Sequence, residues 1–395
     1  MATPLALADL RRLRARSAGL LGDGFRGVEY AVSGIVAVPA AAPTPALALL
    51  PRVRDYRYAE VEDLADHERA LVRVTGLRGH THLVHRALVP ALLDATQAPR
   101  REATFALAAE LGVATPVLDI VRNHVVEALQ GHDPMTPGEL SRLLERKIPE
   151  GERLNRVLAL FCAEGTLVRA TNKGDWQRNA FTYALLSEWV PEAALPGDET
   201  EATRRLADAY VRAYGPVGPH EFSHWSGIPL QEAAAAFAAL HGDFFEVEGR
   251  TLLGYPVHAR LLADGTPEGR AVLLPPNDPL LLAHPPGLGA VSPEAAPWVL
   301  DPQGNAASAI LVDGQAVGLW EASPSKRRVN VRAALLPNAP PGLLRALEEP
   351  LSGLAAFLGV PEVNVERVAL PPPLAERPGW AHQLPLRGMQ PEEQG

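Results

Sequence analysis

The sequence predicts an α+β protein built from tandem winged helix-turn-helix units and a β-rich C-terminal region. Helical segments followed by a short two-stranded ribbon recur along the first 255 residues, and strand-like segments dominate from about residue 256. Hydrophobic residues make up 47% of the 395 residues and charged residues 21%. That composition is typical of a chain that buries sizeable cores.

We expect five segments along the chain. They are a winged helix with a basic N-terminal helix (1–100), a second winged helix (101–195), a third (196–255), a β-rich domain (256–372) and a flexible tail (373–395). The tail is rich in proline and glutamate, a composition typical of disorder.

In the first unit, spaced leucines predict a basic amphipathic helix over 5–21, which Gly22–Gly24 ends. An apolar segment follows at 26–38, and Pro39, Pro43 and Pro45 then interrupt any helix. An acidic helix at 57–68 and strands at 71–75 and 81–84 complete the order of elements of a winged helix.

The second unit repeats this order. Helices are expected at 117–131 and 152–164, and between them Thr136, Pro137 and Glu139 have the spacing of a capping box that opens another helix. The strands LVRA and FTYALL follow, separated by a turn at Lys173-Gly174-Asp175.

The third unit contains helices at 203–214, 220–225 and 230–240, followed by the ribbon FFEVEG and TLLGY. From 256 the strands AVLLP, AASAILVDG, AVGLWEA and RVNVRAALL are expected, with an Asp313-Gly314 hairpin turn between the middle pair. A helix at 341–358, broken near Pro350, completes the prediction.

Charge and cysteine content restrict the class of protein. The net charge of −9 argues against polyanion binding over the whole surface, but residues 69–101 hold six arginines, three histidines and one aspartate. Arginine suits phosphate and base-edge contacts because its planar fork bonds two acceptors. The single cysteine, Cys162, excludes an internal disulfide and a multi-cysteine zinc site, and its apolar flanks predict a core residue.

The longest apolar runs are too short to span a bilayer, and no signal-peptide pattern follows the N-terminal arginines. We therefore expect no membrane contact and a cytoplasmic, nucleoid-associated location.

Four segments, in order, resemble one family. They are LVRVTGLRGHTHLV (71–84), YVRAYGPVGPHEFSHWSGIP (210–229), LLPPNDPLLLAH (273–284) and DPQGNAASAILVDGQAVGLWE (301–321). They are similar to characteristic stretches of the AlkZ/YcaQ winged-helix DNA glycosylases. The resemblance implies tandem winged helices that form a concave DNA-binding surface, and cleavage of the N-glycosidic bond of alkylated bases, including bases in interstrand crosslinks.

One departure from the family is informative. Its Gln-x-Gln or Gln-x-Asp motif follows an Ala-Val pair, and here the aligned stretch places Pro39 and Ala41 where the two polar residues should be. Glycosidic hydrolysis passes through a cation-like sugar and needs a group that positions water. A proline ring and a methyl group cannot do this, so the resemblance carries over DNA binding but not the catalytic pair.

Eight residues are the expected DNA contacts. They are Arg73, Arg78 and His80 by the first ribbon, Lys173 and Arg178 at the second wing, and Lys326, Arg327 and Arg328 in a C-terminal turn. For each group, a solvated loop or strand end is the competing interpretation. Trp225 and Trp320 could stack on an extruded base, but their spacing favours the core.

The catalytic residue is left unassigned. Glu29, His80, His82 and Asp278 are the candidates that could replace the missing pair, although Asp278 before Pro279 better fits a turn cap. Two histidines are too few to predict a metal site, and we expect no cofactor.

The sequence-based hypothesis is a monomer that binds double-stranded DNA, damaged by alkylation or crosslinking. Two alternatives stay open: an active N-glycosylase with a substitute catalytic residue, and a winged-helix transcription regulator. Regulators of that kind are commonly symmetric dimers, and the sequence contains no obvious dimerisation helix or heptad.

Overall fold

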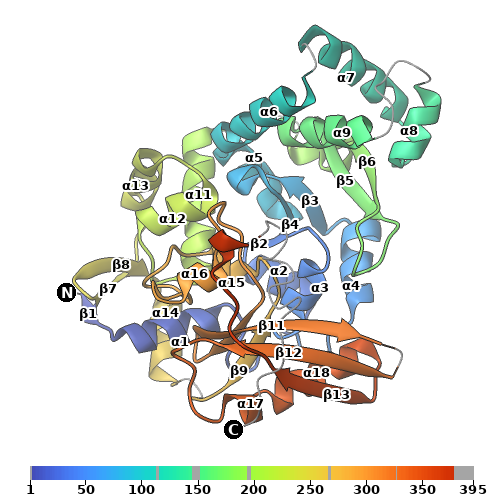
Figure 1. Ribbon diagram of the computed structural model, residues 1–395. Helices are drawn as coiled ribbons and strands as arrows, with labels where there is room; N and C mark the ends of the chain where they lie inside the picture. Colours follow the sequence, from blue (N-terminus) through green and yellow to red (C-terminus); the bar gives the residue numbers. More distant parts are fainter. Residues whose placement is uncertain are drawn as a thin grey trace.

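The computed structural model describes residues 2–112, 115–144, 152–193, 197–265, 268–325 and 327–377. It confirms the α+β class, with helices packed around three sheets (Figure 1). Within the described residues no single helix is long and apolar enough to cross a membrane. Only the pair Gln97–Leu111 and Thr115–Leu129, bent by 106°, meets that test, by length and composition alone.

The two predicted N-terminal ribbons form one five-stranded sheet. Its order is β2 (Ala37–Pro39), β4 (Thr81–His85), β3 (Leu71–Thr75), β5 (Leu167–Asn172) and β6 (Phe181–Leu185). β3 and β5 pair through Arg73 and Arg169, so the first and second units share a sheet. The predicted boundary at residue 100 also falls inside helix α6 (Gln97–Leu111), so the two units do not separate there.

The helices of the first unit lie around this sheet, except the first of them, which packs against the third unit. They are α1 (Leu7–Ser17), α2 (Val28–Gly34), α3 (Thr44–Leu49), α4 (Tyr58–Glu62), α5 (Val89–Ala95) and the short turns η1 (Asp63–His67), η2 (Leu77–Gly79) and η3 (Arg86–Leu88). The expectation that the three prolines interrupt any helix is wrong for α3. Pro45 lies in its first turn, where a missing N–H costs nothing.

The second unit contains α7 (Thr115–Leu129), α8 (Pro137–Leu143), α9 (Glu152–Glu164), α10 (Leu186–Trp189) and η4 (Pro191–Ala193). The capping box is confirmed. Thr136 Oγ1 accepts a hydrogen bond from the Glu139 N–H at 3.2 Å, and Glu139 Oε2 accepts one from the Thr136 N–H at 2.7 Å. Cys162 lies in the core as predicted, 3% exposed, and burial raises the pKa of its thiol to about 11.

The third unit contains α11 (Glu199–Tyr214), α12 (Pro219–Ser226), α13 (Leu230–Ala238), the β7–β8 ribbon (Asp243–Val247 and Arg250–Gly254) and α14 (Pro256–Ala263). The N-terminal β1 (Thr3–Pro4) adds to β7 in parallel. Trp225 is in the core as predicted, with its ring centroid 4.9 Å from that of Tyr210.

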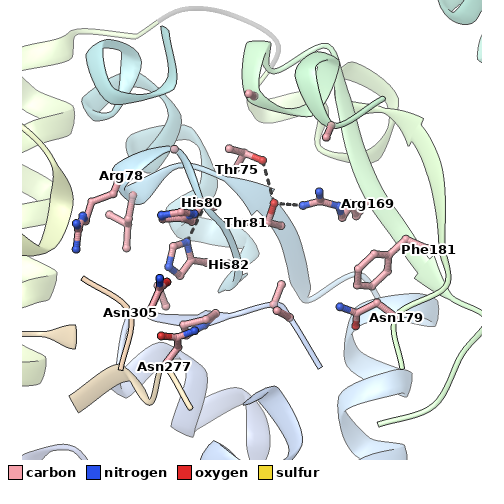
Figure 2. A pocket seen from close by; sticks show the side chains of 18 of the residues that line it. Thr75, Arg78, His80, Thr81, His82, Arg169, Asn179, Phe181, Asn277 and Asn305 are labelled. Atoms are coloured by element: carbon pink, nitrogen blue, oxygen red, sulfur yellow. Dashed lines mark hydrogen bonds between the residues drawn. The ribbon is translucent and has the colours of Figure 1, made fainter. Parts of the chain in front are cut away.

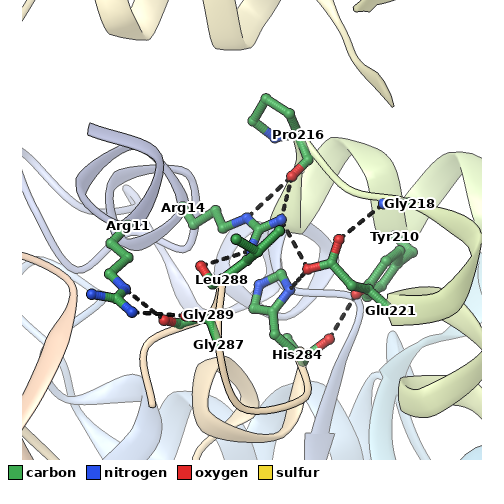
Figure 3. Close-up of polar contacts among 11 residues, drawn as sticks. Arg11, Arg14, Tyr210, Pro216, Gly218, Glu221, His284, Gly287, Leu288 and Gly289 are labelled. Carbon is green, nitrogen blue, oxygen red and sulfur yellow. Dashed lines mark hydrogen bonds and ion pairs between the residues drawn. The ribbon is translucent and has the colours of Figure 1, made fainter. Parts of the chain in front are cut away.

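A buried ionic cluster joins the N-terminal helix to this unit (Figure 3). Arg14 of α1 pairs with Glu221 of α12 at 2.9 Å, and Glu221 lies 3.0 Å from Nδ1 of His284. All three side chains are at most 7% exposed. Arg11 donates to the backbone carbonyls of Gly287 and Gly289. These two arginines of the predicted basic helix therefore stabilise the fold.

The C-terminal sheet has the order β13 (Glu362–Arg367), β12 (Arg328–Leu335), β11 (Gln315–Pro324), β10 (Ala309–Val312) and β9 (Ala271–Leu274). The hairpin turn is confirmed, because Asp313 and Gly314 both have positive φ between the paired Val312 and Gln315. Trp320 is buried, as predicted, and its Nε1 donates to the carbonyl of Leu274 at 2.7 Å.

The last helices differ slightly from the prediction. The expected helix is divided into α17 (Leu343–Ala346) and α18 (Glu348–Leu358), and the break precedes Pro350, which lies in the first turn of α18. The short α15 (Pro279–Leu282) and α16 (Ala296–Val299) precede the sheet's central strands. The expectation of a flexible tail is wrong for its start, since η5 (Leu374–Glu376) buries Leu374; residues 378–395 lie outside the described part.

Candidate nucleic-acid interface

A cavity of about 850 Å³ lies where the five-stranded sheet meets α9 and two segments at 277–282 and 303–305. We call it the sheet pocket. Figure 2 shows the side chains that point into it from both ribbons and from these segments. Its polar lining residues are Thr75, Arg78, His80, Thr81, His82, Thr136, Asn155, Arg169, Lys173, Asn179, Tyr183, Asn277, Gln303 and Asn305.

Strand β2 leads into this pocket at the positions where the sequence predicted a degenerate motif. Pro39 and Ala41 both line it, next to Ala37 and Ala40. β2 is antiparallel to β4, with Pro39 opposite His82, and the Ala40 N–H donates to the carbonyl of Thr81 at 3.0 Å. The two substituted positions therefore face the cavity without filling it.

The two pocket histidines differ in how they are held. His82 is 7% exposed, and its Nδ1 lies 3.1 Å from the carbonyl oxygen of His80. A carbonyl only accepts hydrogen bonds, so Nδ1 carries the hydrogen and Nε2 keeps its lone pair. Burial, assisted by nearby His80, lowers the pKa of His82 to about 4. His80 is exposed at the turn before β4, and desolvation followed by the charge of Arg78 lowers its pKa.

Three cations line the sheet pocket. Arg78 and Lys173 are exposed and Arg169 is half-buried, and none of them forms an ion pair with a carboxylate of the described chain. Arg78, at φ 49°, donates to the carbonyl of Gln303 at 3.4 Å. Gly304 beside this guanidinium has φ 82°, a backbone conformation that L side chains rarely adopt, which favours glycine there. Arg169 donates to the hydroxyl of Thr81.

Arg73 is a wrong prediction as a DNA contact. Its side chain is 6% exposed, pairs with Asp66 at 2.6 Å and donates to the carbonyl of Ala170 at 2.6 Å. The buried guanidinium thus joins η1 to β5 within the fold.

Most other arginines of residues 69–101 are also structural. Arg69 stacks on Trp189 at 3.9 Å, Arg86 pairs with Glu192 at 2.5 Å, and Arg100 donates to backbone carbonyls, including that of Leu93 at 2.8 Å. Of the six arginines in that window, only Arg78 lines the pocket.

Two of the catalytic candidates, Asp278 and Glu29, do not line the pocket. Asp278 is fully buried, pairs with Arg52 at 2.7 Å and caps α15 by accepting from the Leu280 N–H at 2.9 Å. Glu29 does not line the pocket and lies 3.0 Å from Nε2 of His85. His80 and His82 are the candidates that remain at the cavity.

The predicted loop cations are only partly brought together. Lys173 lines the pocket, whereas Arg178 is exposed on the same ribbon outside it. Arg327 and Arg328 are exposed at the end of the β11–β12 hairpin and do not line the pocket, and Lys326 lies outside the described residues.

The sequence interpretation missed Arg169 and the amide side chains. Asn155, Asn179, Asn277 and Asn305 reach the same cavity from four elements far apart in sequence. The sequence LVRA contained one signal for Arg169. It alternates along β5 with the buried Val168 and Ala170, so its side chain is on the opposite face of the strand.

The chemistry of the lining is cationic and neutral. The described residues contribute no carboxylate to it, and no group of three or more His, Cys, Asp or Glu that could hold a metal was found among them. Guanidinium and ammonium groups suit phosphate oxygens, and the amides and rings suit the edge and face of a planar base.

Comparison with known proteins identifies the family. A family model described as DNA glycosylase AlkZ-like matches residues 32–357, a span that includes every wall of the sheet pocket. The chain belongs to the AlkZ-like DNA glycosylase family. Membership makes DNA the partner of this AlkZ-like chain and DNA repair its process.

A solved relative shares the AlkZ-like fold. The Streptomyces sahachiroi DNA glycosylase AlkZ superimposes with a TM-score of 0.73 at 21% sequence identity, over 93% of this chain and 100% of that one. A search of curated protein sequences found no significant match.

Proposed function

We propose that this AlkZ-like protein binds double-stranded DNA over the sheet pocket and receives a damaged nucleotide in it, acting as a monomer on nucleoid DNA in the cytoplasm. The observation that carries the proposal is the set of three unpaired cations, Arg78, Arg169 and Lys173, around a cavity with no described carboxylate. Such a site attracts phosphates although the whole chain has a net charge of −9.

The dimensions of the pocket support entry of a nucleotide. Its volume of about 850 Å³ lies within the roughly 300–1,000 Å³ typical of small-molecule sites. Enzymes and readers that act on one base extrude it from the duplex, and a damaged base costs least to extrude. Arg178, Arg327 and Arg328, exposed beyond the pocket, would extend the contact along the duplex.

Pro39 and Ala41 cannot supply the catalytic groups that the family's usual motif provides. Neither side chain has a polar atom, so neither orients water or opposes positive charge on a sugar. The proposed function is therefore recognition of damaged DNA, which does not require polar side chains at these two positions.

Fluorescence anisotropy with a labelled 25-mer duplex, intact or carrying 7-methylguanine, tests the proposal across a salt series. Each phosphate contact contributes about 0.9 to the slope of log Kobs against log salt. We expect Arg78→Ala and Arg169→Ala each to reduce the slope by about that amount. Arg204→Ala, an exposed arginine paired with Glu201 on α11, is the matched control and should leave it unchanged.

Unchanged slopes for both pocket variants would refute the proposed surface. A footprint confined to one undamaged sequence, with no preference for the lesion, would instead support a transcription regulator.

A further inference from the structure

One side chain of the sheet pocket has the chemistry that cleavage of a glycosidic bond requires. A glycosidic bond is broken with help from a group that holds water near C1′ and does not repel a sugar that is becoming positive. The two candidate carboxylates lie outside the pocket, where Glu29 contacts His85 and Asp278 pairs with Arg52. Cations cannot accept a proton, which leaves the neutral acceptors of the lining.

His82 is held in the one tautomer that suits this task. Its Nδ1–H donates to the carbonyl of His80 at 3.1 Å, so the lone pair is on Nε2. Nε2 forms no hydrogen bond within the described chain, yet it is not sealed from solvent, in contrast to the buried, unpartnered Nε2 of His284.

The register of the sheet places His82 beside the degenerate motif. Pro39 is directly opposite His82 in the β2–β4 pair, and both line the pocket. Side chains of directly opposed residues lie on the same face of a sheet, with Cβ atoms about 4.5–5.5 Å apart. The imidazole therefore occupies the face that the motif positions would share, and Asn277 and Asn305 lie across from it (Figure 2).

We infer that His82 is a catalytic residue, which orients and deprotonates the water that displaces an extruded, positively charged base. This inference rests on the proposed function, because the nucleotide must first enter the sheet pocket. The bond from C1′ to the base nitrogen breaks and its electron pair leaves with the base. The water oxygen bonds to C1′, and its proton passes to Nε2 and then to solvent. The products are an abasic sugar and a neutral base.

The protonation state of His82 is consistent with this step, and the lack of a carboxylic acid in the described lining favours a positively charged base as the substrate. Burial holds the pKa of His82 at about 4, so the ring is neutral at pH 7 and does not repel a cation-like sugar. The described lining includes no carboxylic acid that could protonate a departing base. A base that already carries a positive charge, as a purine alkylated on a ring nitrogen does, needs no such acid to leave.

The test is single-turnover excision from a duplex with 7-methylguanine, read as strand breaks after heating in alkali, with anisotropy on the same duplex. We expect the wild-type protein to excise and His82→Ala to be at least about 100-fold slower, as expected for loss of a general base, with Kd changed less than about threefold. His241→Ala, at an exposed histidine between α13 and β7 that does not line the pocket, is the control and should excise within about threefold of wild type. His82→Asn, which keeps a donor toward the His80 carbonyl and loses the acceptor at Nε2, should fail like His82→Ala if its melting temperature is preserved.

Different failures have different meanings. Tight binding by the wild type without strand breaks, or undiminished excision by folded His82→Asn, overturns the role of His82 and leaves DNA recognition standing. Absence of binding to any duplex overturns the proposed function itself.

Discussion

Removing the charge of Asp278 tests whether this residue stabilises the fold or serves chemistry at the site. Both Asp278 and Arg52 are completely buried, and two hydrogen bonds of 2.7 and 2.8 Å join the guanidinium to the carboxylate. Arg52 also donates to the carbonyls of Ala18 and Ala48. Asp278→Asn preserves the shape of the side chain and leaves the guanidinium without a counter-charge.

The expected cost is large. Removing one partner of a buried ion pair destabilises a protein by about 3–5 kcal/mol, because the remaining charge is uncompensated. Folded proteins have total stabilities of about 5–15 kcal/mol, so this single change removes a substantial part. Replacing both partners, as in Arg52→Met with Asp278→Leu, should recover much of the loss, since it leaves no charge in the core.

Urea unfolding followed by tryptophan fluorescence measures the effect. Asp23→Asn is the matched control: Asp23 pairs with Arg54 at 3.2 Å, but its side chain is 92% exposed, and we expect no measurable change in the midpoint. A stable Asp278→Asn protein that has lost excision would refute the structural assignment and restore Asp278 as a catalytic candidate.

Three further predictions concern stability and reactivity. Acidification from pH 7 toward 4 should lower the urea midpoint. Burial holds the pKa of His258 and His284 at about 4 in the folded protein, below the value of 6.5 in the unfolded chain, so the unfolded chain binds protons first. The stability present above pH 6.5 is therefore lost as the pH falls, by at most about 3 kcal/mol for each ring. A flat profile from pH 7 to 5 would contradict it. Cys162 should react with Ellman's reagent at least about 100-fold more slowly in native protein than in urea; equal rates would show that the thiol is accessible. Thr136→Ala should cost about 1 kcal/mol, and no change would remove the capping box as a stabilising element.

The elements that sequence predicts well are those fixed by short-range chemistry. The capping box at Thr136 and the turn at Asp313-Gly314 depend on residues within three or four positions, and both are present. β13 was not predicted, because Glu362–Arg367 is largely exposed and polar and is ordered by pairing with β12.

The candidate site was harder to predict because a count of charges does not reveal their partners. Asp278 and Arg52 are 226 positions apart in the chain, and Arg169 joins the pocket through pairing of β3 with β5. Pro39 and Ala41, which the sequence singled out, both line the pocket. The sequence could not show that most arginines of residues 69–101 are engaged within the fold.

Hydrogen–deuterium exchange of the protein, with and without a duplex carrying 7-methylguanine, tests most directly whether DNA docks over the sheet pocket. We predict slower exchange in peptides that cover residues 77–82 and 173–181, which contain Arg78, Lys173 and both histidines of the pocket, and no change in α13. Tight binding that leaves both pocket segments unprotected, with protection confined to α13 or the β7–β8 ribbon, would contradict the proposed docking face.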